Sequence, residues 1–278
     1  FLKEDIENFD DAEAISFVNC KTPDVSIIIP VYNQISYTLR CLRSLCKQNT
    51  FVRFEVIIMD DCSNDESPEL LPNIPGLRYF RNSENLGFLR NCNKGAAEAR
   101  GQFLVFLNND TYVLPGWLDN LRLTFIEQDR VGLVGSKLIY PNGVLQEAGG
   151  IVWKDGTAWN WGHLQEPSHP RYNYLRDVDY CSGASIMIPR SLFDTLGRFD
   201  ERYAPANYED TDLAFAVRAA GLRVVYQPKS ELIHFEGVSS GRDVSSGVKK
   251  NQVVNNSKFL RKWRRQLNEH LPNGQTPI

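Results

Sequence analysis

Several residue types and patterns are scarce in this sequence, and each shortage narrows the class of protein. No apolar stretch approaches the ~20 residues that a membrane-spanning helix needs. The six cysteines among 278 residues form no CxxC pair and no regular framework, so we expect reduced thiols in a cytoplasmic protein. A net charge of −3 lacks the basic excess typical of broad nucleic-acid binding, so we expect no nucleic-acid partner.

What remains is typical of a globular enzyme. Hydrophobic residues make up 42% and charged residues 23% of the sequence, which is ordinary for a soluble enzyme. The length fits one large α/β domain or one domain with appended segments. The sequence begins at Phe1 without a signal peptide, so we expect it to be part of a longer multidomain polypeptide.

Two apolar runs each lead directly into a polar cluster that contains aspartate. The run 103–107 leads into Asn108-Asn109-Asp110, and the run 54–59 leads into Asp60-Asp61. In open α/β sheets, ligands bind at the edge where buried strands end. The pair therefore predicts one site that holds a nucleotide and a metal. The alternative is that Asp and Asn follow these strands only because they favour turns.

The order of apolar and amphipathic segments is the alternating pattern of a parallel sheet. We expect strands at 25–29, 54–59, 77–80, 103–107 and 223–226. We expect helices at about 39–46, 89–99, 115–126, 209–220 and 248–267, with Pro115 in the first turn of its helix. Residues 140–180, rich in Gly and Trp, are expected to form loops or an antiparallel hairpin. The predicted fold is α/β, with a mostly parallel, doubly wound sheet.

Seven stretches in this order resemble the motifs of glycosyltransferase family 2, the inverting group with the Rossmann-like GT-A fold. They are VSIIIPVYN (25–33), MDDCSND (59–65), NSENLGF (82–88), FLNND (106–110), CSGA (181–184), NYEDTDL (207–213) and HFEGVS (234–239). Each stretch is weak evidence alone, but the ordered set is highly specific. Within the family, the sequence resembles the rhamnosyltransferase-like branch, which builds bacterial surface polysaccharides.

The resemblance implies three segments. A GT-A domain would cover residues 23–243, with a nucleotide-binding half at about 23–135 and an acceptor-binding half at 136–243. Residues 1–22, which are rich in acids, would be a linker or docking arm. Residues 244–278 would form a basic C-terminal helix and tail.

The resemblance assigns donor-nucleotide contacts to residues of the first half. Pro30, Tyr32 and Asn33 would lie near the base, although for Asn33 a simple turn after the strand is the alternative. Asp61 would accept a hydrogen bond from the imide of uracil or thymine, because an ionised carboxylate only accepts. Asp60 is expected to point into the fold. Asn91 and Lys94, three residues apart on one helix face, would meet ribose or phosphate, with a surface lysine as the alternative.

The resemblance aligns Asn108-Asn109-Asp110 with the DxD motif of GT-A enzymes, which binds Mg²⁺ or Mn²⁺. This sequence departs from the motif at Asn108, so Asp110 is expected to contact the metal and Asn109 the donor. Hard divalent cations prefer oxygen ligands and engage substrate phosphates as well. His234 would be the second protein ligand, since imidazole suits Mn²⁺. The alternative is that His234 is a hydrogen-bonded core residue.

Catalysis is assigned to the first turn of the helix that begins near residue 209. By resemblance Asp210 is the base that takes the proton of the acceptor hydroxyl, and Glu209 orients it or binds the acceptor. The alternative is that both acids only complement the helix dipole, which is all we expect of Asp212. Gly183 and Ala184 would bring bare backbone close to the donor.

Two further predictions concern the acceptor and the membrane. Trp153, Trp159, Trp161 and His163 would form a platform for a glycan or lipid-linked glycan acceptor, with packing against the sheet as the alternative. Seven Lys and Arg residues between 249 and 265 would form a solvated helix face. Alternatively, they would contact anionic lipid at the inner face of the membrane.

The sequence therefore predicts an inverting, metal-dependent transfer of sugar from a UDP- or dTDP-sugar to a glycan hydroxyl. Two alternatives are weaker. A sugar-nucleotide nucleotidyltransferase should carry a glycine-rich phosphate loop, and residues 25–36 contain no glycine. A non-catalytic glycan-binding domain should have lost Asp110, Asp210 and His234, and all three are present.

Overall fold

The computed structural model describes residues 14–237 and 250–275. The acidic residues 4–13, Lys249 and the end of the last family motif lie outside these ranges. In the first half the elements are β1 (Val25–Val31), α2 (Ile35–Cys46), β2 (Phe54–Asp60), α3 (Ser67–Leu70), η1 (Leu71–Asn73), β3 (Leu77–Arg81), α4 (Phe88–Glu98), β4 (Phe103–Leu107), β5 (Thr111–Val113) and α5 (Trp117–Glu127). In the second half they are β6 (Val131–Ile139), β7 (Leu145–Glu147), β8 (Gly150–Val152), β9 (Ala158–Asn160), η2 (Pro170–Tyr172), β10 (Arg176–Asp177), β11 (Ser185–Pro189), α6 (Arg190–Thr195), η3 (Glu201–Tyr203), α7 (Glu209–Ala219), β12 (Arg223–His234) and α8 (Lys250–Leu267).

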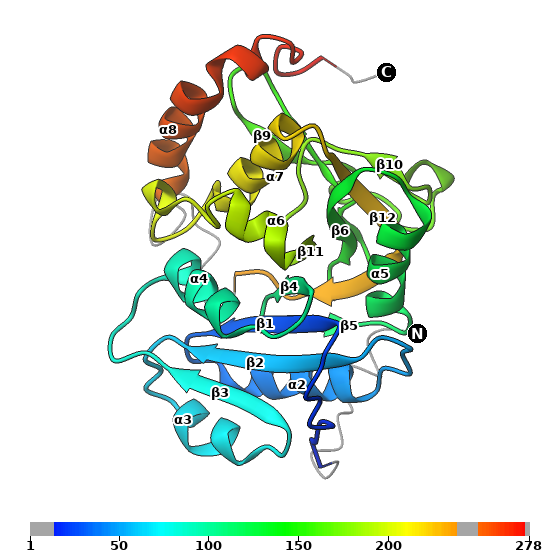
Figure 1. Ribbon diagram of the computed structural model, residues 1–278. Helices are drawn as coiled ribbons and strands as arrows, with labels where there is room; N and C mark the ends of the chain where they lie inside the picture. Colours follow the sequence, from blue (N-terminus) through cyan, green and yellow to red (C-terminus); the bar gives the residue numbers. More distant parts are fainter. Residues whose placement is uncertain (1–13, 238–249, 276–278) are drawn as a thin grey trace.

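One large sheet organises the molecule, in the order β10-β12-β6-β11-β4-β1-β2-β3 (Figure 1). Strands β4, β1, β2 and β3 pair in parallel and form the half predicted to bind the nucleotide. Strand β11 runs antiparallel between β4 and β6, while β12 pairs in parallel with β6. The carboxyl ends of β1, β2 and β4 therefore meet at one edge, as the strand-end aspartates require.

Helices cover both faces of the sheet, which confirms the predicted α/β class. All seven residues of β1 are buried, which explains its largely apolar sequence. Alternate residues face opposite sides. Ile28 packs in the cluster that contains α4, α6 and α7, whereas Ile27 and Ile29 pack in the cluster that contains α2 and α5.

Some element boundaries differ from the prediction. Helix α5 begins at Trp117 rather than at residue 115, because Gly116 takes the left-handed φ of 79° immediately before it. Strand β12 continues from Tyr226 to His234, with a register shift between Gln227 and Glu231. Such a bulge accommodates Pro228 inside a long strand, and it lets β12 deliver His234 to the nucleotide edge.

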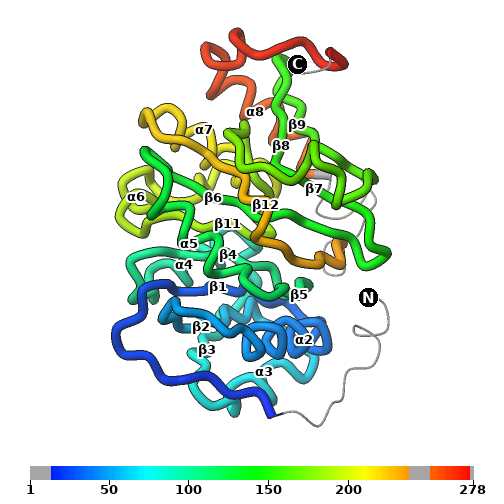
Figure 2. Tube along the Cα trace, turned by 90° about the vertical axis from the view of Figure 1, so that its right-hand side faces the viewer, coloured from blue at the N-terminus to red at the C-terminus, as the bar shows by residue number. Residues whose placement is uncertain are grey.

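The last helix packs onto the domain. Phe259, Trp263 and Leu267 of α8 belong to the same core cluster as α7, and both views place α8 on the side of α7 away from β1–β3 (Figures 1 and 2). Lys258 donates to the carbonyl of Arg202, and Lys262 pairs with Asp200. Part of the predicted basic face is therefore used inside the molecule.

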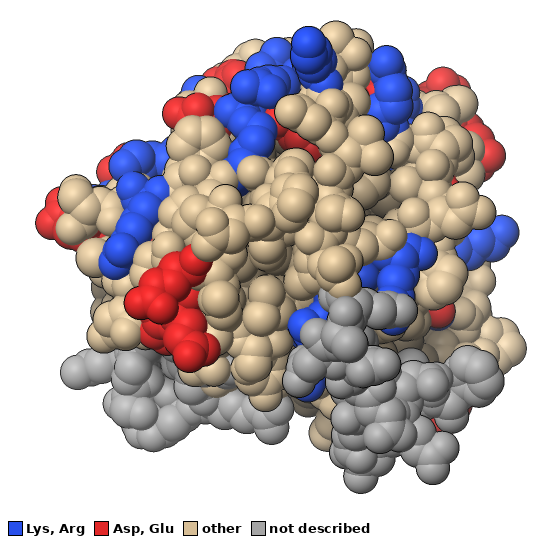
Figure 3. All heavy atoms as spheres, turned by 90° about the horizontal axis from the view of Figure 1, so that it is seen from below, with Lys and Arg blue, Asp and Glu red and all other residues tan. Residues whose placement is uncertain are grey.

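No helix in the described ranges combines the length and the apolar character needed to cross a bilayer. Seen from below, Lys and Arg side chains lie mainly around the margin of a largely uncharged surface (Figure 3).

Candidate active site

A cavity of about 480 Å³ opens where the strands of the nucleotide half end. Its walls come from the ends of β1, β2, β4 and β12, from the loop before β11, and from the start of α7. The predicted site residues in its lining are Pro30, Tyr32, Asp61, Asn91, Asn109, Asp110, Gly183, Ala184, Glu209, Asp210 and His234. Residues that the sequence separates by up to 204 positions (30 to 234) thus converge on one space.

Asp110 and His234 face each other at one end of this cavity. Asp110 Oδ1 lies 3.2 Å from His234 Nε2. Strand pairing of β5 with β12 sets this distance, because His234 is opposite Thr111 and the N–H of Phe235 donates to the carbonyl of Asp110. Both side chains are buried, at 6% exposure each. The prediction that these two residues meet is consistent with their geometry.

Gln146 fixes the orientation of the His234 ring. Its side-chain oxygen lies 3.1 Å from His234 Nδ1. An amide oxygen only accepts, so Nδ1–H donates to Gln146 and Nε2 is directed at Asp110. Nε2 and Asp110 Oδ1, 3.2 Å apart, can share a proton or can bind a cation together. The donor set of one carboxylate and one oriented imidazole therefore fits Mn²⁺ or Mg²⁺, although the described residues contain no group of three or more acidic, His or Cys ligands.

Asp61 is held firmly and still faces the cavity. Its Oδ1 accepts from Asn82 Nδ2 at 2.8 Å and from the N–H of Leu86 at 2.9 Å. Its Oδ2 accepts from the N–H of Gly87 at 2.8 Å. A carboxylate has about four acceptor positions, so one position remains for a donor in the cavity.

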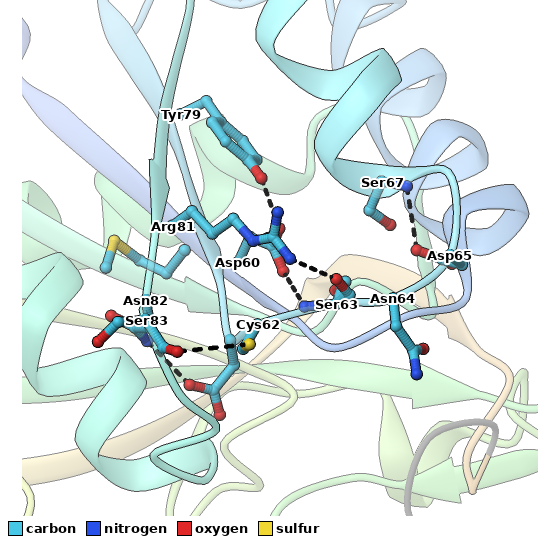
Figure 4. A network of polar contacts seen from close by, with 12 residues as sticks. Asp60, Cys62, Ser63, Asn64, Asp65, Ser67, Tyr79, Arg81, Asn82 and Ser83 are labelled. Carbon is cyan, nitrogen blue, oxygen red and sulfur yellow. Dashed lines mark hydrogen bonds and ion pairs between the residues drawn. The ribbon is translucent and has the colours of Figure 1, made fainter.

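Asp60 points into the fold, as predicted (Figure 4). It accepts from the hydroxyl of Tyr79 and from the N–H of Ser63, and Arg81 lies beside it. The two neighbouring aspartates therefore have different tasks. Asp60 holds the loop after β2, and Asp61 faces the cavity.

Three of the residues predicted to contact the nucleotide form hydrogen bonds that hold the loops around the cavity. Asn33 accepts from the N–H of Asn64 through its side chain and does not line the cavity. Asn91 donates to the carbonyl of Met59 and accepts from Asn82. Lys94, also outside the lining, donates to Asn82 Oδ1 at 2.8 Å. Asn82 thus connects Asp61 to both of these α4 residues.

Asp210 lies opposite the backbone of the CSGA segment. Its Oδ2 accepts from the N–H of Gly183 at 2.9 Å, and its Oδ1 accepts from the N–H of Thr211 at 2.7 Å. Burial raises the pKa of Asp210, and these two N–H groups oppose the shift. A Cβ on Gly183 would lie 3.5 Å from Asp210 Cβ, an ordinary van der Waals distance, so the approach of Asp210 does not itself require glycine.

Glu209 differs from its neighbour Asp210 in its hydrogen bonding. Burial and the adjacent Asp210 charge raise the pKa of Glu209 to about 8. One of its carboxyl oxygens, Oε2, is buried without a hydrogen-bond partner among the described residues. Burial thus favours the protonated form of Glu209 at neutral pH, whereas two backbone N–H groups stabilise the ionised form of Asp210.

Asp212 does more than complement the helix dipole, so that expectation is wrong. It is 3% exposed and accepts from Tyr203 Oη at 3.0 Å, Trp263 Nε1 at 2.7 Å and Lys262 Nζ at 2.7 Å. Its three donors come from η3 and α8. Asp212 thus joins the catalytic helix α7 to the C-terminal helix.

Glu147 is a buried acid that the motifs did not indicate. Its Oε1 accepts from the N–H of Ser182 at 2.9 Å, and its Oε2 has no partner among the described residues. Burial raises the pKa of Glu147 to about 8, with smaller contributions from the charges of Asp210 and Glu236. Strand β7 therefore supports the site twice, through Gln146 to His234 and through Glu147 to the segment that contacts Asp210.

We expect Glu147→Gln to stabilise the protein above neutral pH. An unfolded glutamate titrates near pH 4.3, whereas the folded group holds its proton up to about pH 8. Between these values the unfolded state has lost a proton that the folded state keeps, so rising pH favours unfolding. Glutamine keeps the acceptor for Ser182 without this loss.

Thermal unfolding at pH 5 and pH 8.5 tests this expectation. The variant should gain stability over the wild type mainly at pH 8.5, with about 2–4 °C in Tm for each kcal/mol. Glu69→Gln, at an exposed position of α3, is the matched control and should change little at either pH. A Tm difference between Glu147→Gln and the wild type that is independent of pH would contradict the assignment.

The three tryptophans predicted to bind acceptor lie outside this cavity. Trp153 is 3% exposed and packs edge-on against Trp159. Trp161 lies beneath the guanidinium groups of Arg171 and Arg176, at 4.8 and 5.2 Å from the ring centre. Trp153 and Trp161 line a second cavity of about 950 Å³. An acceptor role for these residues stays a prediction.

Comparison with solved structures defines the class of fold. The chain superposes on a structure of GalNAc-T7 with UDP, GalNAc and Mn²⁺ with a TM-score of 0.69, at 19% sequence identity over 90% of this chain and 49% of that one. This likeness shows a GT-A glycosyltransferase fold, as the sequence predicted.

The sequence comparisons give the family. Residues 26–197 match the model of glycosyl transferase family 2, and the chain belongs to that family. It is 32% identical over 233 residues to the O-antigen biosynthesis protein RfbC of Myxococcus xanthus, covering 80% of this chain and 18% of that protein. It is 28% identical over 218 residues to the N-acetylglucosaminyl-diphospho-decaprenol L-rhamnosyltransferase of Mycobacterium tuberculosis, covering 69% of each.

Proposed function

We propose that this domain transfers one sugar, with inversion, from a UDP- or dTDP-sugar to a hydroxyl of a growing bacterial surface glycan. The observation that carries the proposal is the single cavity. It brings together Asp61 with its free acceptor position, the Asp110–His234 pair and the Glu209–Asp210 acids. The family membership and the polysaccharide-related relatives support it.

The nucleotide end of the cavity would hold the donor. Tyr32 is 42% exposed and lines the cavity beside Asp61, so its ring is available to pack on a base. The free acceptor position of Asp61 suits an imide N–H. Guanine also offers N–H donors on its Watson–Crick edge, but on a larger ring system, so the site is expected to prefer pyrimidine diphosphates.

We expect Asp61→Ala to weaken UDP binding by roughly 1.5–3 kcal/mol, as for loss of a hydrogen bond to a charged group. UDP and dTDP should raise the Tm of the wild type in the presence of Mn²⁺, whereas GDP should not. Titration calorimetry with UDP measures the loss, and GDP serves as the control ligand. Equal stabilisation by GDP and UDP would sink the assignment of Asp61.

Asp110 and His234 would hold Mn²⁺ or Mg²⁺. The bound ion would offset the charge that develops on the leaving diphosphate. Asn109 is fixed by its bond to the hydroxyl of Thr38 at 3.0 Å, so it keeps the metal segment in register. Gly183 and Ala184 present backbone rather than bulk to the donor sugar.

Asp210 would take the proton of the acceptor hydroxyl as that oxygen attacks the sugar carbon from the face opposite the diphosphate. It is placed for this role because it lines the cavity and is oriented by Gly183 and Thr211. Protonated Glu209 would hydrogen-bond the acceptor or the donor sugar. Neither acid forms a covalent bond to the sugar in this scheme.

The experiment that tests the function is a donor panel. The chain is incubated with Mn²⁺ and each of several UDP- and dTDP-sugars, and release of the nucleoside diphosphate is followed. Slow hydrolysis of at least one donor, without added acceptor, is the expected result. No release from any donor, with UDP still bound, would favour a non-catalytic glycan-binding domain.

A further inference from the structure

The loop that precedes Glu209 and Asp210 needs support from outside itself. Residues Pro205, Ala206 and Asn207 line the catalytic cavity. Asn207 and Tyr208 have φ values of 76° and 74°, in the left-handed region that side chains other than glycine rarely adopt. Such a conformation persists only when surrounding contacts hold it in place.

Asn255 of α8 supplies the main contacts. Its side-chain nitrogen lies 2.9 Å from the carbonyl of Tyr203, 3.0 Å from that of Ala206 and 2.9 Å from that of Asn207. The residue is 1% exposed, so water does not compete for these carbonyls. Its amide oxygen accepts from Lys258 Nζ at 2.8 Å, which fixes the nitrogen toward the loop.

The loop that Asn255 holds in turn supports the proposed catalytic acids. The backbone N–H of Asn207 hydrogen-bonds the carboxyl group of Glu209 and lowers its pKa against the effect of burial. Tyr208, next in the chain, is held through its hydroxyl, which accepts from Asn256 Nδ2 and donates to the carbonyl of Gly156, both at 2.9 Å. Contacts from α8 thus reach both residues of the loop's left-handed bend.

A second set of contacts from α8 holds helix α7. Lys262 and Trp263 of α8 both donate to Asp212 of α7, as described above. Asn255 and Lys262 therefore fix the two ends of the segment 203–212, with Asp210 between them. Helix α8 lies beyond residues 26–197, the part that matches the family model.

We propose that α8 is part of the catalytic apparatus and that Asn255 is a positioning residue for Glu209 and Asp210. This inference rests on the proposed function, because it assigns α8 to the same site. Asn255 does not line the cavity, so it acts through the loop and not on the substrate.

The test compares Asn255→Ala with the wild type in the full chain. Alanine favours helix more than asparagine does, so the substitution does not weaken α8 itself, and it removes the two N–H groups that the Asn255 amide offers to the loop carbonyls. Misplacement of a catalytic group by about 1 Å can cost about 10²-fold. We therefore expect kcat for release of nucleoside diphosphate from the active donor of the panel to fall about 10²-fold. The affinity for UDP should fall much less than kcat, because none of the hydrogen bonds of Asn255 reaches Asp61.

Two readouts separate positioning from simple destabilisation. The acidic limb of the kcat–pH profile should move to higher pH, because Asp210 loses its alignment with the Gly183 N–H that lowers its pKa. Amide hydrogen exchange should become faster across residues 206–212 and remain the same at residues 25–33. The exchange measurement needs no activity, so it distinguishes failure of this inference from failure of the proposed function.

Matched variants complete the test. Gln252→Ala removes an exposed amide from α8 and should behave as the wild type. Asn256→Ala should lower kcat in the same direction but less, and it takes over the test if Asn255→Ala does not fold. Wild-type kcat, pH profile and exchange in the folded variant would overturn the proposal. A loss of UDP affinity as large as the loss of kcat would also overturn it, because it would indicate general damage to the site.

Discussion

Asp210→Asn is expected to cut sugar transfer by roughly 10²–10⁴-fold, the usual contribution of a positioned base, while UDP still binds. The substitution keeps the shape of the side chain, and its amide oxygen can still accept from Thr211. It removes the proton acceptor, and one carboxylate oxygen facing Gly183 becomes an amide group. The measurement is kcat for nucleoside diphosphate release, together with the Kd for UDP.

Glu209→Gln is the matched comparison for this base. Because burial and the Asp210 charge raise the pKa of Glu209 to about 8, the wild-type group is already mostly neutral at pH 7. A neutral amide should therefore cost less than the loss of Asp210, chiefly through acceptor affinity. A dead Glu209→Gln beside a fully active Asp210→Asn would show that the base is assigned to the wrong neighbour. Activity in both would place proton removal elsewhere.

Asp110→Ala is expected to abolish measurable turnover, and His234→Ala to weaken the response to Mn²⁺. Each variant removes half of a two-ligand set, since Asp110 Oδ1 and His234 Nε2 face each other at 3.2 Å. Only one carboxylate is present in the pair, so loss of Asp110 leaves a single neutral ligand.

Mn²⁺ titration of activity, followed by EDTA, measures the metal effect. UDP-dependent stabilisation with and without Mn²⁺ checks binding independently of catalysis. If both variants keep full activity in EDTA, protein groups hold the diphosphate and the metal assignment fails. A response of His234→Ala to Mn²⁺ equal to that of the wild type would remove His234 from the ligand set.

The parts of the site that the sequence could predict are those written into local patterns. Strands β1, β2 and β4 can be recognised in the sequence as apolar runs. Parallel pairing of these strands then brings Asp61 and Asp110 to one edge of the sheet. The start of α7 was predictable because Glu209 directly precedes an amphipathic stretch. The resemblance to the family then predicted that these separate segments form one site.

The remaining parts depend on contacts between distant segments. Gln146 and Glu147 lie on a three-residue strand inside a glycine-rich stretch, and their partners His234 and Ser182 are 88 and 35 residues away. In the sequence, Asn255 cannot be told from any other polar residue of a basic helix, because its contacts depend on the packing of α8 on α7. Asp212 could not be told from a dipole-complementing acid, because its donors Lys262 and Trp263 follow 50 and 51 residues later.

The prediction for the tryptophans shows a different limit. The aromatic composition suggested an acceptor platform, yet composition does not tell toward which cavity a side chain points. Trp153 and Trp161 line the second cavity, beside arginines, and neither reaches the catalytic one. Lipid contact by the basic C-terminal helix also stays a prediction. Of its cationic side chains, Lys258 and Lys262 are bound within the molecule, and Arg261, Arg264 and Arg265 are exposed.

The central claim is a single displacement in this cavity, with Asp210 as base. Its most direct test is the configuration of the sugar released from a hydrolysed donor, followed by proton NMR before the anomers equilibrate. With the active donor of the panel and Mn²⁺, the first sugar to appear should have the anomeric configuration opposite to that of the donor, and Asp210→Asn should release it far more slowly. Release of the sugar with the donor's own configuration would contradict the account.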